Sequence, residues 1–433
     1  MIKNIIFSFI LIIFSNCSLD TKTNIWKETN EENKNNQLKE IFKKSNFKLK
    51  EFNTNIKINL KEKFSKNTYE NNLKNNLGYL NYDGSLKKIK SIKFDKVKNF
   101  KFIDKEIHFT QGNKIVFSEK RGSIIKTDED LKKIWKVNHY TKNEKKTHPN
   151  LFFASNLNYL IVADSISNYY KINLINGDLV WKKNNVAPFN SQIKIYKDKF
   201  FVVDLENVLR CYSIETGEEI WSFKSESSYI NSQNKLSMVI DVNKVVFINS
   251  LGDITALRLN NGRLLWQTPT QLTAIKEDSF TLKNSELVLS KKNIYFSNNK
   301  NELFSINLNN GRINWKQLVN SGLKPSLIGN LLFIFSRNGF FVIIDTNNGN
   351  IIRVTQILID NKSFEKLKIS PISFLIGKKN VYLNLNNGKI IRIKILDGKF
   401  LDLSKIDSKV ISQSYVFNQN LFLLKENSLI KLD

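Results

Sequence analysis

Short apolar runs typical of β-strands recur along the chain at nearly regular intervals. Each run follows a turn residue (Asn, Asp or Lys) and is rich in Val, Ile, Phe and Tyr, the residues most favoured in strands. Eight such runs occupy residues 115–117, 159–162, 200–202, 245–247, 294–296, 331–333, 381–383 and 421–423. This regular recurrence predicts one strand of this kind in every unit of a repeat protein.

A second pattern, a turn residue followed by glycine, three residues and tryptophan, alternates with these runs. The complete copies are Asn176-Gly177 to Trp181, Thr216-Gly217 to Trp221, Asn261-Gly262 to Trp266 and Asn310-Gly311 to Trp315. Trp135 ends an earlier copy that lacks the glycine, and in two later copies Arg353 and Asp402 occupy the tryptophan position. Successive positions are 38 to 49 residues apart, which is the length of one four-stranded propeller blade.

The residues of this pattern have structural uses. Asn-Gly and Thr-Gly tolerate the positive φ that a tight hairpin between third and fourth strands needs. The tryptophan then falls on the outer strand, where its large ring can pack between neighbouring blades. The alternative, a surface stripe of tryptophans that binds a ligand, is less favoured because five tryptophans share one structural position.

The two patterns differ in number, which indicates how the ring closes. The apolar runs occur eight times and the glycine–tryptophan unit seven times, since the last run is followed only by residues 427–433. A strand-like segment at residues 86–94 has no blade of its own. Pairing it with the last blade would remove an open sheet edge. The sequence therefore predicts an all-β fold, an eight-bladed β-propeller over residues 79–433, closed by an N-terminal strand that pairs with the last blade.

The first residues have the features of an export signal. Lys3 precedes an apolar run at residues 5–14, which is too short to span a bilayer. The following Phe14-Ser15-Asn16-Cys17 resembles a bacterial lipobox, and Ser18 after the cysteine resembles the signal for the outer membrane. We therefore expect a lipoprotein signal peptide at residues 1–16 and lipidation at Cys17. The polar residues 17–78 would form a tether, mostly disordered. An ordinary signal peptide with an incidental cysteine is the alternative.

Composition and charge exclude several classes of protein. The formal net charge is +27, but the excess is nearly all lysine spread over the whole chain, with no arginine cluster. We therefore expect no nucleic-acid binding, and a lysine-rich surface that favours anionic lipid headgroups.

Cys211 lies in a strand-like run and is expected to be a small buried hydrophobe. His108, His139 and His148 lack metal-ligand spacing and are interpreted as surface residues, so no metal, cofactor or catalytic residue is predicted.

The repeat resembles the PQQ-type propeller repeat, and its best copy is residues 256–266, from Ala256 to Trp266. With the lipobox and eight blades, the chain resembles the BamB family, lipoprotein subunits of the β-barrel assembly machinery. This resemblance implies a non-enzymatic scaffold on the periplasmic face of the outer membrane. It also implies binding to the POTRA domains of the central barrel protein, contact with nascent outer-membrane proteins, and a monomer within a hetero-complex.

In that family the partner is bound by loops that follow the tryptophans of two successive early blades. The matching stretches here are residues 184–192 and 224–235, which lack the family's arginine and paired acidic residues. The candidate partner-binding residues are Pro188, Phe189, Asn190, Ser191, Asn234 and Lys235. Phe189 is a candidate aromatic anchor, and packing beneath its own loop is an equal alternative.

Two other functions remain open at this point. Quinoprotein dehydrogenases share the repeat, but this chain has no adjacent cysteine pair and no insertion long enough to cover a cofactor. The other possibility is a propeller that binds a different envelope partner, such as peptidoglycan or a secreted polymer.

Overall fold

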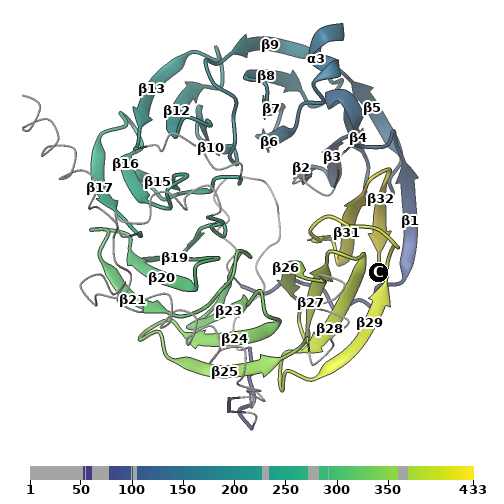
Figure 1. The fold of residues 1–433 in the computed structure, drawn as a ribbon. Helices are drawn as coiled ribbons and strands as arrows, with labels where there is room; N and C mark the ends of the chain where they lie inside the picture. Colours follow the sequence, from purple (N-terminus) through teal and green to yellow (C-terminus); the bar gives the residue numbers. More distant parts are fainter. Residues whose placement is uncertain are drawn as a thin grey trace, which may run out of the picture. The chain divides into compact units, whose positions relative to one another are not determined.

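The computed structural model describes residues 52–53, 55–60, 78–98, 100, 105–226, 234–271, 282–290, 292–358 and 369–433. Their strands form eight four-stranded antiparallel sheets arranged around a ring (Figure 1). This confirms the prediction of an all-β, eight-bladed β-propeller. In seven of the sheets the strands follow chain order from the inner to the outer strand, so each of these blades is a simple meander.

The first four blades contain strands β2 to β17. Their bounds are β2 (Ile107–Thr110), β3 (Lys114–Ser118), β4 (Ile124–Thr127) and β5 (Lys133–Val137); β6 (Leu151–Ser155), β7 (Tyr159–Asp164), β8 (Asn168–Asn173) and β9 (Leu179–Asn184); β10 (Lys194–Tyr196), β11 (Lys199–Val203), β12 (Val208–Ser213) and β13 (Glu219–Lys224); and β14 (Met238–Ile240), β15 (Lys244–Ile248), β16 (Ile254–Arg258) and β17 (Leu264–Thr268). Two short helices accompany blade 1, namely η3 (Lys120–Gly122) and α3 (Lys142–Lys146).

Blades 5 to 7 contain strands β18 to β29. Their bounds are β18 (Val288–Leu289), β19 (Asn293–Asn298), β20 (Glu302–Asn307) and β21 (Ile313–Gln317); β22 (Ser326–Ile328), β23 (Leu331–Phe335), β24 (Phe340–Asp345) and β25 (Ile351–Gln356); and β26 (Pro371–Ile376), β27 (Asn380–Leu385), β28 (Lys389–Lys394) and β29 (Phe400–Lys405).

Blade 8 combines strands that are far apart in the sequence. Its three inner strands are β30 (Tyr415–Phe417), β31 (Asn420–Lys425) and β32 (Ser428–Leu432), and its outer strand is β1 (Lys88–Lys93). Strand β1 pairs antiparallel with β32. The Asp433 carboxylate accepts hydrogen bonds from Ser85 Oγ and the Lys87 amide, both at 2.6 Å, and the Tyr82 hydroxyl donates to the Asp433 carbonyl. Side-chain contacts therefore reinforce the pairing of the two segments.

Burial explains why the apolar runs are continuous rather than alternating. All eight lie on the second strand of a blade, where neighbouring blades cover both faces of the sheet. In β11, for example, every residue after Lys199 is buried, whereas the outer strand β13 of the same blade is mostly exposed. The apolar clusters join adjacent blades: Trp135 of blade 1 packs with Phe153 and Leu160 of blade 2.

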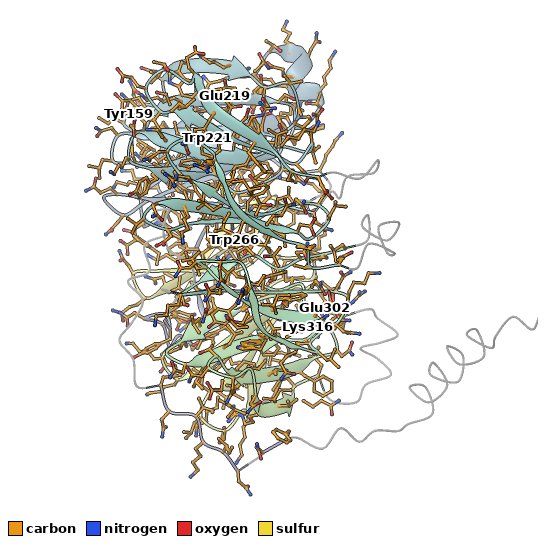
Figure 2. All side chains as sticks on the ribbon, turned by 90° about the vertical axis from the view of Figure 1, so that its left-hand side faces the viewer. Tyr159, Glu219, Trp221, Trp266, Glu302 and Lys316 are labelled. Atoms are coloured by element: carbon orange, nitrogen blue, oxygen red, sulfur yellow. The ribbon has the colours of Figure 1, made fainter. Side chains whose placement is uncertain are left out.

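The repeat tryptophans connect each blade with the next one. In five consecutive blades the indole Nε1 donates a hydrogen bond to a backbone carbonyl near the start of the third-to-fourth-strand turn of the following blade. The pairs are Trp135–Leu174 (3.1 Å), Trp181–Ile214 (3.3 Å), Trp221–Leu259 (3.2 Å), Trp266–Leu308 (3.0 Å) and Trp315–Thr346 (3.0 Å). Figure 2 shows Trp221 and Trp266 on the outer strands of neighbouring blades. The rings thus pack between blades.

The repeat glycines have both a conformational and a steric role. Gly311 has φ +72°, and a Cβ atom there would lie 2.5 Å from Cε3 of Trp266 in the preceding blade. Gly262 has φ +68°, and its Cβ would lie 2.6 Å from Cε3 of Trp221. A side chain at either position would therefore strain the turn and displace the ring. Each tryptophan and the next glycine form one packing unit across a blade boundary.

Some residues that the sequence assigns to the tether contact the propeller. Phe52 forms an isolated antiparallel bridge with Val354 of blade 6, and Ile58 is only 6% exposed. Phe52 and Ile58 therefore lie against the propeller, although the sequence places them in the tether. Cys17 and the predicted signal peptide lie outside the described residues. No helix within the described ranges is long and apolar enough to cross a bilayer.

Cys211 has the environment expected from its sequence context. It lies on β12, is completely buried and forms no disulfide. Burial raises the pKa of its thiol to about 12. The interpretation of Cys211 as a small buried hydrophobe is confirmed.

Candidate functional site

The two loops predicted to bind a partner lie next to each other on one face of the propeller. Both connect the outer strand of one blade with the inner strand of the next; the first spans residues 185–193 and the second residues 225–237, of which 227–233 are outside the described part. We call them the paired loops, and the face on which they lie the loop face. Asn190 Nδ2 donates to the Asn234 carbonyl at 2.9 Å, and the Leu236 amide donates to the Asn190 carbonyl at 2.8 Å. The structure therefore brings Asn190 and Asn234 together.

A buried carboxylate supports the first of the paired loops. Asp204 is completely buried in the β11–β12 turn and accepts hydrogen bonds from the amides of Glu206 and Val208, both at 3.0 Å. Its other oxygen accepts from Arg210 Nε at 2.9 Å and from Asn185 Nδ2 at 3.3 Å. Because four donors neutralise and orient the carboxylate, Asp204 holds residue 185 of the loop at a fixed position.

Phe189 is not an exposed anchor. It is 1% exposed and lies edge-on to the Tyr169 ring, with the ring centroids 5.9 Å apart. Its amide donates to the Asp164 carbonyl at 3.1 Å. Of the two alternatives that the sequence left open, the structure has Phe189 packed beneath its own loop. The sequence could not distinguish them because Tyr169 comes from a different strand.

The large apolar side chain that the first loop exposes is Val186, which sequence reasoning did not select. It is 88% exposed, among the highest values for large apolar residues in the described part of the chain. Pro188 is half-buried two residues later. The signal that could have identified Val186 is its place between two hydrogen-bonded loop residues, Asn185 and Ala187, rather than its residue type.

Ser191 and Lys235 have mainly structural contacts. The Ser191 hydroxyl is buried; it accepts from the Val203 amide at 2.7 Å and donates to the Gln192 carbonyl at 2.8 Å. Lys235 forms an ion pair with Glu106 of blade 1, and its side chain is 11% exposed. Pro188, Asn190 and Asn234 are half-buried, and Asn234 Nδ2 donates to the Leu282 carbonyl at 2.7 Å.

More charged side chains lie immediately before or on the inner strands. Lys324 and Glu286 form an ion pair at 2.9 Å. Burial alone would raise the pKa of Glu286, but the charges of Lys324, Lys235 and Lys194 outweigh it and lower the pKa to about 2. Lys194 is 8% exposed, and burial lowers its pKa to about 8. These groups make the mouth of the ring on the loop face a region of mixed charge.

One of the three histidines is not the surface residue that the sequence suggested. His108 is 5% exposed, its Nε2 lies 2.8 Å from Ser155 Oγ, and burial lowers its pKa to about 3. His139 is half-buried, with Nε2 3.0 Å from the Gly177 carbonyl, and His148 is also half-buried. Within the described ranges, no three His, Cys, Asp or Glu side chains are grouped so that they could hold a metal ion.

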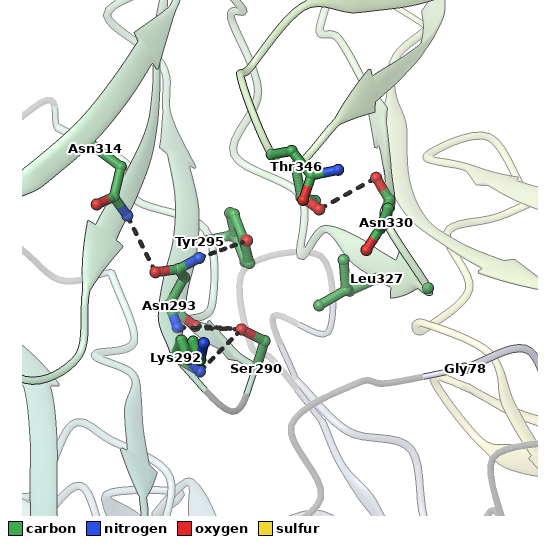
Figure 3. Close-up of a pocket in the computed structure, with 11 residues that line it drawn as sticks. Gly78, Ser290, Lys292, Asn293, Tyr295, Asn314, Leu327, Asn330 and Thr346 are labelled. Carbon is green, nitrogen blue, oxygen red and sulfur yellow. Dashed lines mark hydrogen bonds between the residues drawn. The ribbon is translucent and has the colours of Figure 1, made fainter.

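A cavity of about 630 Å³, lined by residues that are mostly of polar types, lies between blades 5 and 6 (Figure 3). Asn293 Nδ2 donates to the Tyr295 hydroxyl at 3.3 Å, and Asn314 Nδ2 donates to Asn293 Oδ1 at 3.1 Å. The Thr346 hydroxyl donates to the Asn330 carbonyl at 3.2 Å. Several of its polar groups thus bond to one another.

Comparisons with known proteins give the family and the fold. The family model described as outer membrane protein assembly factor BamB matches residues 120–355, which is more than half of the chain. No curated protein sequence matches the chain. BamB from Moraxella catarrhalis aligns with a TM-score of 0.64 and 12% identity, over 80% of this chain and 99% of that one. Sqt1 from Saccharomyces cerevisiae aligns with a TM-score of 0.59 and 14% identity, over 83% and 99%.

A computationally designed propeller, Ika8, aligns with a TM-score of 0.57 and 11% identity, over 81% of this chain and 99% of that one. Because all these identities are low, the structural matches show the propeller fold alone. The family match is different in kind, since it covers the repeats from blade 1 to blade 6. The chain therefore belongs to the family of the outer membrane protein assembly factor BamB.

Proposed function

We propose that the chain is a non-enzymatic scaffold lipoprotein of the outer-membrane β-barrel assembly machinery. It binds the POTRA domains of the central barrel protein and so assists the folding and insertion of outer-membrane proteins. The observation that carries this proposal is the adjacency of the two paired loops on one face of a BamB-family propeller.

The physical character of the paired loops supports partner binding. Val186 offers an exposed apolar side chain, and the side-chain amides of Asn190 and Asn234 tie the two loops to each other and to the Leu282 carbonyl. The Asp204 contacts fix the backbone of the first loop before any partner arrives, so binding costs little ordering of that loop. An exposed apolar side chain on a preformed loop can be buried by a partner with little loss of conformational entropy.

Attachment to the membrane follows from the lipobox resemblance. Cys17 carries the lipid after removal of residues 1–16, and residues 17–78 connect it with the propeller. Several acyl chains on one residue anchor a protein stably, whereas a single chain binds only marginally. The lysine-rich surface favours anionic headgroups over nucleic acid.

Affinity purification of the full-length protein from cell envelopes tests the proposed partner. The wild-type protein should recover the central barrel protein, and Val186→Glu should lose it. Val242→Glu is the matched control, because Val242 is 77% exposed in the β14–β15 turn on the opposite face. Recovery of a different stable partner without the barrel protein would favour a propeller for another envelope component. If both variants lose the barrel protein equally, the partner does not bind specifically through the loop face.

A further inference from the structure

Blades 6 and 7, in which Arg353 and Asp402 replace the repeat tryptophan, both contact the chain that precedes β1. Asp402, at the tryptophan position of blade 7, pairs with Arg392, whose Nη1 donates to the Gly84 carbonyl at 3.2 Å. Arg353, at the tryptophan position of blade 6, bonds to the Ile56 carbonyl at 3.1 Å. Both replacements therefore coincide with a contact to residues that precede β1.

The geometry at Arg353 explains why arginine stands there. The side chain is 1% exposed, and Nη2 donates to the Ile395 carbonyl at 3.0 Å, the same kind of bond to the next blade that each tryptophan makes. Nη1 donates to the carbonyls of Leu396, at 2.8 Å, and Ile56. An indole has one donor and a guanidinium has five. Arginine thus keeps the connection between blades and adds a contact to the N-terminal chain.

Residues 52–58 make further contacts along the same edge. The Phe52 amide donates to the Val354 carbonyl at 3.1 Å, and Asn53 Nδ2 donates to the Ile352 carbonyl at 2.9 Å. The Ile58 amide donates to the Leu396 carbonyl at 2.8 Å, and its side chain packs into the apolar cluster shared by blades 6 and 7. The segment therefore occupies the free edge of the outer strand β25 and crosses to blade 7.

We propose that Arg353 is a latch that fixes the N-terminal chain to the rim between blades 6 and 7, and that the lipid-bearing tether leaves the propeller at this rim. The position of the latch follows from the contacts above, and its relevance to a membrane rests on the lipid anchor of the proposed function. The latch is on the opposite side of the ring from blades 2 and 3, which carry the first of the paired loops (Figure 1).

The latch also sets how far the propeller can move from the membrane. Thirty-four residues lie between Cys17 and Phe52, whereas sixty lie between Cys17 and Gly78, the first described residue after the latch. A chain spans at most about 3.3–3.6 Å per residue. The greatest distance between Cys17 and the first residue fixed to the propeller therefore falls from roughly 200–215 Å to roughly 110–120 Å when the latch is closed. The anchored propeller is thus held closer, and the rim at blades 6 and 7 is the part nearest to the point of attachment along the chain.

Hydrogen exchange on the full-length protein tests the latch independently of lipidation. Arg353→Trp restores the repeat residue and the bond to blade 7 but cannot reach Ile56. The amides of Phe52 and Ile58 should then exchange about 10- to 100-fold faster, the range expected for loss of a hydrogen bond to a charged group. The amides of Gly78 and Leu80, which donate to Leu327 and Ile376, should be unchanged.

Two further variants keep this test decisive. Ile58→Asp places a charge against the apolar cluster of blades 6 and 7, so it should displace the segment and accelerate exchange at Phe52 in the same way. Asp402→Trp makes the corresponding change in blade 7 and should leave Phe52 and Ile58 protected. Unchanged protection in both Arg353→Trp and Ile58→Asp would overturn the latch.

The membrane consequence has a separate readout. Lipidated protein is labelled at Lys399→Cys in blade 7 or at Glu218→Cys in blade 3, the residues that follow the repeat glycine in each blade. Energy transfer to an acceptor lipid in phosphatidylethanolamine–phosphatidylglycerol vesicles should be higher from Lys399→Cys, and Arg353→Trp should abolish the difference. Equal transfer from both sites with an intact latch would overturn the assigned side. Absence of the protein from the vesicles would contradict the lipid anchor instead.

Discussion

Removing one repeat tryptophan measures how strongly neighbouring blades are joined. Trp266 is 9% exposed, its Nε1 donates to Leu308 of blade 5, and its ring packs against Gly311. A buried tryptophan side chain removes about 200 Å² from water, which is worth roughly 5 kcal/mol at about 25 cal/mol per Å². A compact unfolded state lowers this by about 10–40%, to roughly 3–4.5 kcal/mol. The indole hydrogen bond adds about 1 kcal/mol.

We therefore expect Trp266→Ala to reduce the free energy of unfolding by about 3–5 kcal/mol, the range measured for such truncations in protein cores. Urea denaturation followed by far-ultraviolet circular dichroism measures the change. Leu265→Ala is the matched control, because this neighbour on the same strand is 38% exposed and should cost less than about 1 kcal/mol. A loss below about 1 kcal/mol at Trp266 would refute the inference that the rings join the blades.

A second substitution tests the packing unit itself. Gly311→Ala alone should destabilise the protein, because the new Cβ meets the Trp266 ring and the backbone has positive φ. In the Trp266→Ala background the ring is absent, so only the backbone strain and the contact with Thr268 Oγ1 remain. The two changes should therefore be non-additive by about 1–2 kcal/mol. Additivity within about 0.5 kcal/mol would show that the glycine serves the turn alone.

Four other predictions concern three single side chains and the binding of a cofactor. Burial lowers the pKa of His108 to about 3 from an ordinary value of 6.5, so the unfolded chain binds a proton in this window and the folded protein does not. The free energy of unfolding should therefore fall as the pH drops from 6.5 toward 3, and His108 should contribute about 1.4 kcal/mol per pH unit to this fall. Urea denaturation at several pH values measures it, and the fall should be shallower for His108→Gln. An identical pH dependence in the two proteins would contradict the inference that His108 is buried without a proton. Cys211 should not react with a thiol reagent at pH 8 unless the protein is unfolded, since burial raises its pKa to about 12; rapid labelling of the folded protein would show that the strand opens. Cys17→Ser should release the protein from membranes, and salt-resistant sedimentation of the variant would count against the lipid anchor. The purified protein should bind no PQQ in the presence of calcium, whereas stoichiometric uptake with dye reduction would support an enzyme.

The repeat could be read from the sequence because its signals are local. Glycine at the turn and tryptophan four residues later act within one hairpin and its neighbour, and the apolar runs mark strands covered on both faces. Counting the two patterns was therefore enough to predict eight blades.

The alternative left open at Phe189 and the error at His108 concern residues whose environment is set by distant parts of the chain. Phe189 lies under Tyr169, and His108 lies against Ser155 of the next blade, so neither burial follows from the neighbouring residues in the sequence. Val186 was missed for the opposite reason, since an apolar residue in a loop usually indicates packing. In the sequence Arg353 has the position of a degenerate repeat residue, and its role depends on the Ile56 carbonyl, which the sequence around Arg353 does not indicate. Contacts over about 300 residues leave no local pattern.

The shared construction of blade 8 has a consequence for biogenesis. Strand β1 is synthesised early, but its partner β32 appears more than 330 residues later. A contact of such high sequence separation forms late and slowly. Until then β1 has an unpaired edge that could join another chain, and its Lys88, Lys90 and Lys93 side chains oppose such pairing by their charge. The three lysines thus disfavour pairing of β1 with another chain until β32 has been synthesised.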